Sequence, residues 1–273
     1  MTLAAAVRSE SVKQITTSMW WLLAIILVAY VAFTAAALGF VFAASASGAL
    51  PGQQMTIDPS ILPPTISSSA TSVGYVFPLL IGTLMVTSEF RPQTLTPTFL
   101  AFPRRGTALA GKVVVGILLG LLYGVLGTLA AVGAGAGFLA GFGIDTGLGE
   151  ADTWALIGRM LIAFVLWVLI GIGVGALVRN QVGAVVGVLV FTQFLEPIGR
   201  VAGSFVDGLS EVVRFLPGAA GDALVGASVF TGIGPTGGDG GTLEWWAGGI
   251  VLLAYAAVFL VVGWATTWRR DVS

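Results

Sequence analysis

The chain has 273 residues, of which 56% are hydrophobic and 9% are charged, with a formal net charge of −1 and a mean hydropathy of +0.98. A soluble domain carries about 25% charged residues, so this composition argues against a water-soluble globule and for a chain surrounded mostly by lipid. The chain has no Cys, which excludes disulfides and thiolate sites, and no His, the usual general base and commonest metal ligand. We therefore expect neither a metal site nor an enzyme.

Six segments are apolar enough to cross a membrane, for which roughly 20 residues are needed. They are residues 20–42, 72–87, 107–139, 153–178, 181–195 and 245–264. The first segment is too long for a signal peptide and has no small-residue cleavage pattern, so we expect a retained helix. The pattern predicts an all-α, polytopic integral membrane protein with a single transmembrane domain over residues 1–273.

An amphipathic helix is predicted over residues 1–19, before the first span. Its apolar side chains fall roughly on one helical face: Leu3, Val7, Val12, Ile15 and Met19. Arg8, Glu10 and Lys13 lie elsewhere on the helix, which suits a helix lying along the inner leaflet. An ordinary basic flank before the first span is the alternative.

A polar loop with several prolines, residues 88–106, separates the second and third spans. Glu89 closes the second span, Pro92 can begin a short helix and Pro103 can end it. That helix would carry an apolar face made of Thr94, Leu95, Thr98, Phe99 and Leu100. It either docks on something outside the bilayer and transmits movement into the bundle, or it only binds anionic lipid.

Residues 106–113 nearly match a P-loop, but Val113 stands where Ser or Thr would hold magnesium, and no strand precedes the segment. We therefore expect no nucleotide site, and we expect Lys112 to snorkel toward the inner head groups. Farther along the third span, Gly116, Gly120 and Gly124 are spaced by four residues, which favours close helix packing. The contact is either a moving helix contact or dimer seam, or static packing within the chain.

Two segments are predicted to lie on the outer side. Residues 45–71 are rich in Ser, Thr, Gly and Pro and are expected to form an extracytoplasmic loop. Residues 196–244 are expected to form short amphipathic or re-entrant helices, interrupted at Pro217. Arg159 and Glu196 both approach the outer face, where they could form an ion pair of structural or functional importance.

The distribution of basic residues predicts that both termini are cytoplasmic. Nine of the twelve basic residues then fall at inner ends: Arg8, Lys13, Arg91, Arg104, Arg105, Lys112, Arg179, Arg269 and Arg270. Ten of the thirteen acidic residues fall on the outer side. The expected location is the cytoplasmic membrane, with several passes.

Several of these residues, taken in order, resemble the type-2 ABC transporter permease family, the membrane subunits of many bacterial drug, lipid and polysaccharide exporters. The matching residues around the loop are Glu89, Gln93-Thr94-Leu95, Pro103-Arg104-Arg105 and Lys112. The N-terminal segment is similar to the family's amphipathic helix through Ser9-Glu10, Lys13, Thr16-Thr17 and Trp20-Trp21. Leu216-Pro217-Gly218 resembles the family motif before the last span.

The resemblance implies a separate ATP-binding cassette subunit, which would dock on the loop and on the N-terminal helix. The docking residues would be Glu89, Phe90, Arg91, Thr94, Leu95, Thr98, Pro103, Arg104 and Arg105. ATP and Mg²⁺ would bind to that partner, with no cofactor in this chain. The permease would pair with an identical or related permease, contact membrane lipids and bind no nucleic acid.

The sequence thus predicts the permease subunit of an ABC exporter whose cargo is a hydrophobic or amphipathic compound. One alternative is a membrane scaffold or sensor that transports nothing. Another is a secondary transporter, which the lack of a chain of ionisable residues within the spans disfavours. A strict requirement for an ATPase partner would separate the first hypothesis from the other two.

Overall fold

The computed structural model describes residues 2–47, 59–89, 105–178, 180–203, 205–206, 208–230 and 243–268, and every regular element in these ranges is helical. Six helical segments in this part of the chain are long and apolar enough to cross a membrane. This finding confirms the predicted number of spans and the prediction of an all-α, multi-pass membrane protein.

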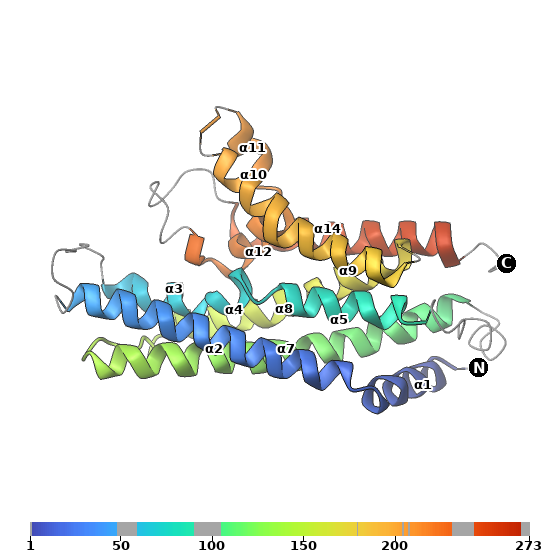
Figure 1. Cartoon of the computed structure of the whole chain (residues 1–273), viewed down its shortest axis with the longest axis horizontal. Coiled ribbons are helices and arrows are strands. Elements are labelled where there is room, and N and C mark those ends of the chain that lie inside the picture. The colour runs from blue at the N-terminus through green and yellow to red at the C-terminus, as the bar shows by residue number, and fades with distance from the viewer. Residues whose placement is uncertain are drawn as a thin grey trace.

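The helices follow one another in the order α1 (Leu3–Thr16), α2 (Met19–Ala46), α3 (Leu62–Ser67), α4 (Ser69–Ser72), α5 (Val76–Thr87), α7 (Arg105–Gly141), α8 (Ala151–Leu177), α9 (Gln181–Val190), α10 (Glu196–Gly203), α11 (Leu209–Val213), α12 (Pro217–Val225) and α14 (Trp245–Gly263). A 3₁₀ turn, η1 (Pro59–Ile61), precedes α3, and two π-helical turns, η2 (Phe191–Leu195) and η3 (Trp264–Trp268), follow α9 and α14. Helix α1 and the end of α14 lie at the same end of the molecule, which we call the α1 end (Figure 1).

Helix α8 is the centre of the bundle and packs against α5, α7 and α14. Its side chains Met160, Phe164 and Trp167 are buried among these neighbours. Helix α2 lies along α7, and the two helices run side by side for much of their length (Figure 1). A span surrounded by other helices needs apolar or small residues on all sides, which is what the sequence of α8 provides.

The second span begins at Leu62 rather than at residue 72, so residues 62–71 are not part of an outer loop. Two of its hydroxyls donate to carbonyls of the preceding turn, namely Ser68 Oγ to Thr65 O at 2.8 Å and Thr71 Oγ1 to Ser68 O at 2.9 Å. Hydroxyls paired in this way can be buried at little cost. The polar composition of the segment predicts a loop, whereas the chain forms a buried, interrupted helix there.

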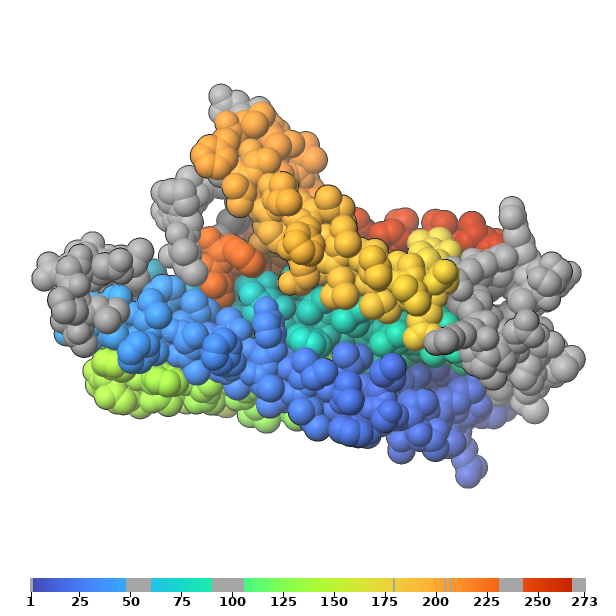
Figure 2. Space-filling model, in the orientation of Figure 1, coloured from blue at the N-terminus to red at the C-terminus, as the bar shows by residue number. Residues whose placement is uncertain are grey.

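The fifth span is also longer than predicted, because it continues beyond Leu195 through α10 to Gly203. The π-helical turn η2 joins α9 to α10 without a break. These helices lean away from the rest of the bundle, and together with α11 they stand out from its surface (Figures 1 and 2). Their outward side chains are large, apolar and exposed: Val182, Phe194, Leu195, Ile198 and Val201.

The predicted glycine contact lies between α7 and α8, within the chain. A Cβ atom added at Gly116 would lie 2.5 Å from Ile172 Cδ1, and one added at Gly120 would lie 2.7 Å from the backbone of Val165. At Gly124 it would lie 3.0 Å from a side-chain carbon of Leu161. The absence of side chains at these positions therefore allows the backbones of α7 and α8 to approach closely, which supports the packing interpretation.

Candidate functional site

Four charged side chains meet at the α1 end, where α1, the end of α5 and the beginning of α7 come together. We call this group the inner ion cluster: Glu10, Lys13, Glu89 and Lys112. Glu10 and Lys13 are on α1, Glu89 follows the last turn of α5, and Lys112 is in the second turn of α7. The cluster therefore joins three segments that are distant in sequence.

Lys112 is the centre of this cluster, and its side chain is only 1% exposed. Its Nζ donates to Glu10 Oε1 at 2.7 Å, to Glu89 Oε1 at 2.8 Å and to the carbonyl oxygen of Met85 at 3.0 Å. A lysine ammonium has three donors, and all three are used here. The prediction that Lys112 snorkels to the head groups is thus wrong: its charge is neutralised inside the protein.

Lys13 completes the cluster from the more exposed side. Its Nζ donates to Glu89 Oε1 at 2.9 Å and lies 3.7 Å from Glu10 Oε2. The cluster thus holds two cations and two anions. Because charges of opposite sign lie so close together, the cost of removing each from water is largely offset by its neighbours.

The pKa values of Glu89 and Lys13, which lie outside the spans, reflect this balance of charges. Burial by itself would raise the pKa of Glu89, but the charges of Lys112 and Lys13 and their hydrogen bonds lower it below its usual value. Burial would lower the pKa of Lys13, whereas hydrogen bonds and charges from Glu89 and Glu10 raise it. Both groups are therefore ionised around neutral pH.

The face of α1 that packs on the bundle combines apolar residues with one carboxylate. Ala6 and Glu10 are buried, and Ala6 packs beside Gly111 of α7. Leu3, Val12 and Ile15 are exposed, as is Arg8. The helix thus attaches to the bundle through Ala6, the partly buried Val7 and the carboxylate of Glu10, and leaves its larger apolar side chains on the surface, an arrangement suited to contact with lipid.

The predicted docking residues are only partly covered by the structure. Glu89 is buried in the inner ion cluster, and Arg105 is the first residue of α7. The remaining seven lie outside the described residues: Phe90, Arg91, Thr94, Leu95, Thr98, Pro103 and Arg104. Glu89 is therefore placed to connect the loop to the bundle through its partners Lys112 and Lys13.

A second polar group lies deep in the bundle, where α4, α10 and α12 meet. We call it the central polar cluster: Ser72, Tyr75, Glu196, Arg200, Asp222 and Ser228. Asp222 accepts hydrogen bonds from Arg200 Nη1 at 2.7 Å, from Ser72 Oγ at 2.8 Å and from Ser228 Oγ at 2.7 Å. This carboxylate thus holds the short helix α12 to both the second and the fifth span.

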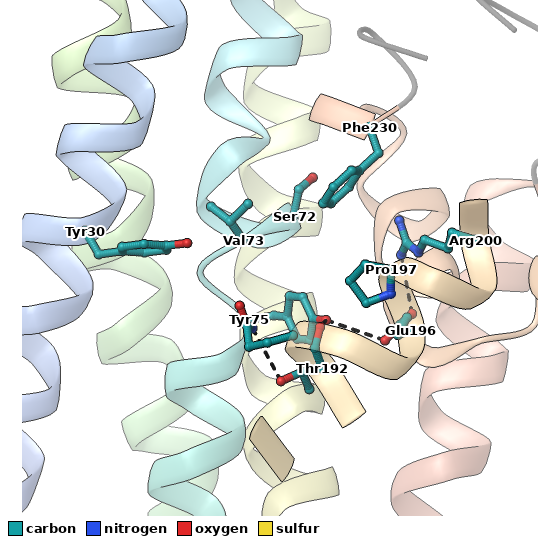
Figure 3. Close-up of a pocket in the computed structure, with 10 residues that line it drawn as sticks. Tyr30, Ser72, Val73, Tyr75, Thr192, Glu196, Pro197, Arg200 and Phe230 are labelled. Atoms are coloured by element: carbon teal, nitrogen blue, oxygen red, sulfur yellow. Dashed lines mark hydrogen bonds and ion pairs between the residues drawn. The ribbon is translucent and has the colours of Figure 1, made fainter. Parts of the chain in front are cut away.

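Glu196 binds the other side of the same guanidinium. Its Oε1 lies 3.5 Å from Arg200 Nη2 and accepts from the backbone N–H of Ala219 at 3.1 Å. Tyr75 points toward this carboxylate, and its hydroxyl donates to the carbonyl oxygen of Thr192 at 3.1 Å (Figure 3). The cluster thus places two carboxyl groups around one guanidinium.

The depth of this cluster follows from the length of α5. The 12 residues of α5 separate Tyr75 from the α1 end of the span, a distance of about 18 Å at a rise of about 1.5 Å per residue. The hydrocarbon core of a bilayer is about 30 Å thick, so the distance from the end of α5 to Tyr75 is more than half of that thickness. Tyr75 also packs against Trp167 of α8, with ring centroids 4.4 Å apart.

The predicted Arg159–Glu196 ion pair does not form, and the structure gives each residue another partner. Arg159 lies over the ring of Trp245, 5.8 Å from its centroid, and its Nε donates to the carbonyl oxygen of Ala155. Glu196 is paired with Arg200, one turn later on the same helix. The prediction places both residues at the outer face, but α10 continues the fifth span and turns Glu196 into the bundle.

Sequence reasoning missed the two central partners, Arg200 and Asp222. The spacing of Glu196 and Arg200, four residues apart on one helix, was a signal for a pair. No comparable signal marked Asp222, because its partners Arg200 and Ser72 are 22 and 150 residues away in the sequence.

A cavity of about 60 Å³ adjoins the central polar cluster. Tyr30, Tyr75, Glu196 and Phe230 contribute to its walls (Figure 3). The volume is enough for water molecules, which need two or more polar partners each. The guanidinium of Arg200 lies over Phe230, 5.3 Å from the ring centroid, so the cavity lies beside a fixed charge.

Comparison with protein-family models and with curated proteins gave no match. What the chain does must therefore be inferred from its own residues.

Proposed function

We propose that the protein is the membrane-spanning permease subunit of an ATP-driven exporter of the ABC type. The resemblance of its loop motifs to the type-2 permeases suggests the class, and the six long apolar helices fit the family's plan. A separate ATP-binding cassette chain would bind ATP and Mg²⁺. The cargo class that best fits the apolar spans is a hydrophobic or amphipathic compound.

The inner ion cluster is the observation that carries this proposal. Glu89 and Lys112 flank the loop at positions 90–104, and they contact each other and α1. A force applied to that loop would act on α5, α7 and α1 together, because one buried lysine joins all three. This is the mechanical connection that a permease needs if its motor is another chain.

The distribution of charges supports one orientation of the proposed permease in the membrane. The basic loop and both chain termini would face the cytoplasm, by the excess of Lys and Arg at those ends. The protein would then lie in the cytoplasmic membrane with the ATPase on the α1 end. The exposed apolar side chains of α9 and α10 supply a surface for a second permease copy or a related permease.

The proposal is tested by affinity purification in mild detergent, with identification of bound proteins and an ATPase assay. We expect a stoichiometric ATP-binding cassette protein, which is lost in the double variant Arg104→Glu/Arg105→Glu and kept in Arg159→Gln, a control away from the loop. Glu89→Gln should keep the ATPase bound but lower transport per ATP hydrolysed. A preparation without any ATPase, from cells that contain the native partner genes, would refute the proposal.

The central polar cluster favours a second candidate, an ion-coupled secondary transporter. Carboxylates within membrane spans are typical of ion pathways, and the carboxyl groups of Glu196 and Asp222, buried between helices, would fit such a role. The two candidates differ in their energy source. Transport in vesicles that needs ATP and continues in the presence of a protonophore supports the exporter, whereas transport that needs no ATP and stops with a protonophore supports the alternative.

A further inference from the structure

A second, larger cavity of about 310 Å³ lies beside the inner ion cluster, between α1, the end of α5 and the first residue of α9. Sites for small molecules occupy roughly 300–1,000 Å³, so this cavity can hold one small ligand or the headgroup end of a larger one. It lies at the α1 end, away from the cavity at the central polar cluster. Neither the loop motifs nor the proposed ATPase accounts for it.

The walls of this cavity change from apolar to polar along the bundle. Ile81, Leu84 and Met85 line it on α5, and Ser88 follows one turn later, at the end of the span. The distance from residue 81 to residue 88 is about 10 Å, at a rise of about 1.5 Å per residue. The cavity thus has a polar side at the α1 end and an apolar side along the span, which matches the polarity of a lipid.

Among the described residues at the polar end, the charges balance each other. Glu10 and Glu89 face Lys13 there, and the buried Lys112 supplies the second positive charge. A headgroup with a net charge would place an uncompensated charge in this partly buried site, which is costly. A headgroup that carries both charges meets opposite charges a few ångströms apart, since Lys13 Nζ lies 2.9 Å from Glu89 Oε1.

Two amide side chains add to this polar wall. Gln14 comes from α1 and Gln181 from the beginning of α9. An amide both donates and accepts hydrogen bonds, so it can bind phosphate oxygens, an amine or an ester carbonyl. The wall therefore offers donors and acceptors without adding to the charge.

We propose that this cavity binds one membrane phospholipid with a zwitterionic headgroup that carries an amine, such as phosphatidylethanolamine. The phosphate lies at the Lys13 ammonium, the amine at the carboxylates of Glu10 and Glu89, and the first part of an acyl chain against Leu84 and Met85. Because the headgroup contacts the inner ion cluster, binding stabilises the attachment of α1 to α5. The site does not depend on an ATPase and goes beyond the proposed export function.

The test is native mass spectrometry of the purified full-length protein after incubation with an equimolar mixture of phosphatidylethanolamine and phosphatidylglycerol. We expect one retained phosphatidylethanolamine, preferred by about tenfold over phosphatidylglycerol, which corresponds to about 1.4 kcal/mol. Leu84→Trp fills the cavity and should abolish the retained lipid. Leu118→Trp, the same change at a 57% exposed position of α7, should retain it.

A second variant distinguishes loss of the lipid site from general unfolding of the protein. Gln181→Leu changes only the polar wall, at the surface, and should reduce the preference for phosphatidylethanolamine while the elution profile stays monodisperse. Retention of the lipid by Leu84→Trp at the wild-type level, or a preference for phosphatidylglycerol in the wild type, would overturn the proposal. Because no ATPase takes part in lipid binding, such a result would not affect the co-purification test of the exporter. Likewise, failure of the co-purification test would leave the lipid site unaffected.

Discussion

Replacing Lys112 by Met tests how much the inner ion cluster contributes to the stability of the protein. The side chain is 1% exposed and its Nζ lies 2.7 Å and 2.8 Å from two carboxylate oxygens. At an effective dielectric constant of about 20, each contact is worth roughly 6 kcal/mol before the cost of desolvation is subtracted. Removing one member of a buried pair typically costs about 3–5 kcal/mol net, because the remaining charge stays buried.

The lower end of that range applies here, because Lys13 remains 2.9 Å from Glu89 and compensates one of the two carboxylates. We therefore expect Lys112→Met to lower the free energy of unfolding by about 3 kcal/mol. The measurement is reversible unfolding in mixed micelles, with Arg8→Met on the exposed side of α1 as a control that should change stability by less than about 0.5 kcal/mol.

A double variant separates lost charge balance from lost packing. Lys112→Met combined with Glu10→Gln leaves Lys13 and Glu89 as a balanced pair, so the double variant should be less destabilised than the sum of the two single variants. An interaction of about 1–3 kcal/mol is expected for residues in one network. A loss below about 1 kcal/mol for Lys112→Met, or strict additivity in the double variant, would refute the electrostatic reasoning.

Three further predictions concern other parts of the structure. The pKa of Glu89 is lowered in the folded state, so the ionised Glu89 stabilises the folded protein at a pH above the ordinary glutamate pKa of about 4.3. This stabilisation is lost as the pH falls through the lowered pKa of the folded state. Unfolding free energies measured from pH 7 to pH 3 should show this loss, and Glu89→Gln should reduce it. Gly120→Val should destabilise the α7–α8 contact by about 1–3 kcal/mol, whereas Gly137→Val, where an added Cβ meets nothing within 4 Å, should have a smaller effect in the same unfolding assay; equal effects would contradict the close contact. Asp222→Asn should cost about 3–5 kcal/mol because Arg200 loses its closest carboxylate, and Glu211→Gln, in a pair whose Glu is 66% exposed, should cost less than about 1 kcal/mol; thermal unfolding that ranks them in the opposite order would contradict the assignment.

The number of spans was predictable from the sequence because several long apolar segments with almost no charges are stable together only in a lipid environment. The start of the second span was not predictable, since residues 62–71 are rich in hydroxyl groups, and bonds such as those of Ser68 and Thr71 to the helix backbone favour their burial. The glycine spacing on α7 correctly indicated a close contact, although the partner helix was not specified. The path of α10 was not predictable either, because the apolar run ends at Glu196 and the charged groups that follow resemble an outer surface.

The inner ion cluster was only half visible in the sequence. The sequence indicates Glu10, Lys13 and Glu89 individually, but as residues of a surface helix and a docking loop, and it favours the membrane surface for Lys112. Their association depends on how α1 folds back against α7, and a contact between residues 102 positions apart leaves no local pattern in one sequence.

The attachment of α1 through Glu10 has a consequence for how the protein is made. Glu10 is synthesised 102 residues before its partner Lys112, which at about 5–20 residues per second corresponds to roughly 5–20 s of translation. Because α1 packs mainly on α7, it gains most of its contacts with the bundle only after that lysine has been made. We therefore expect α1 to join the bundle only after the first two spans have been made.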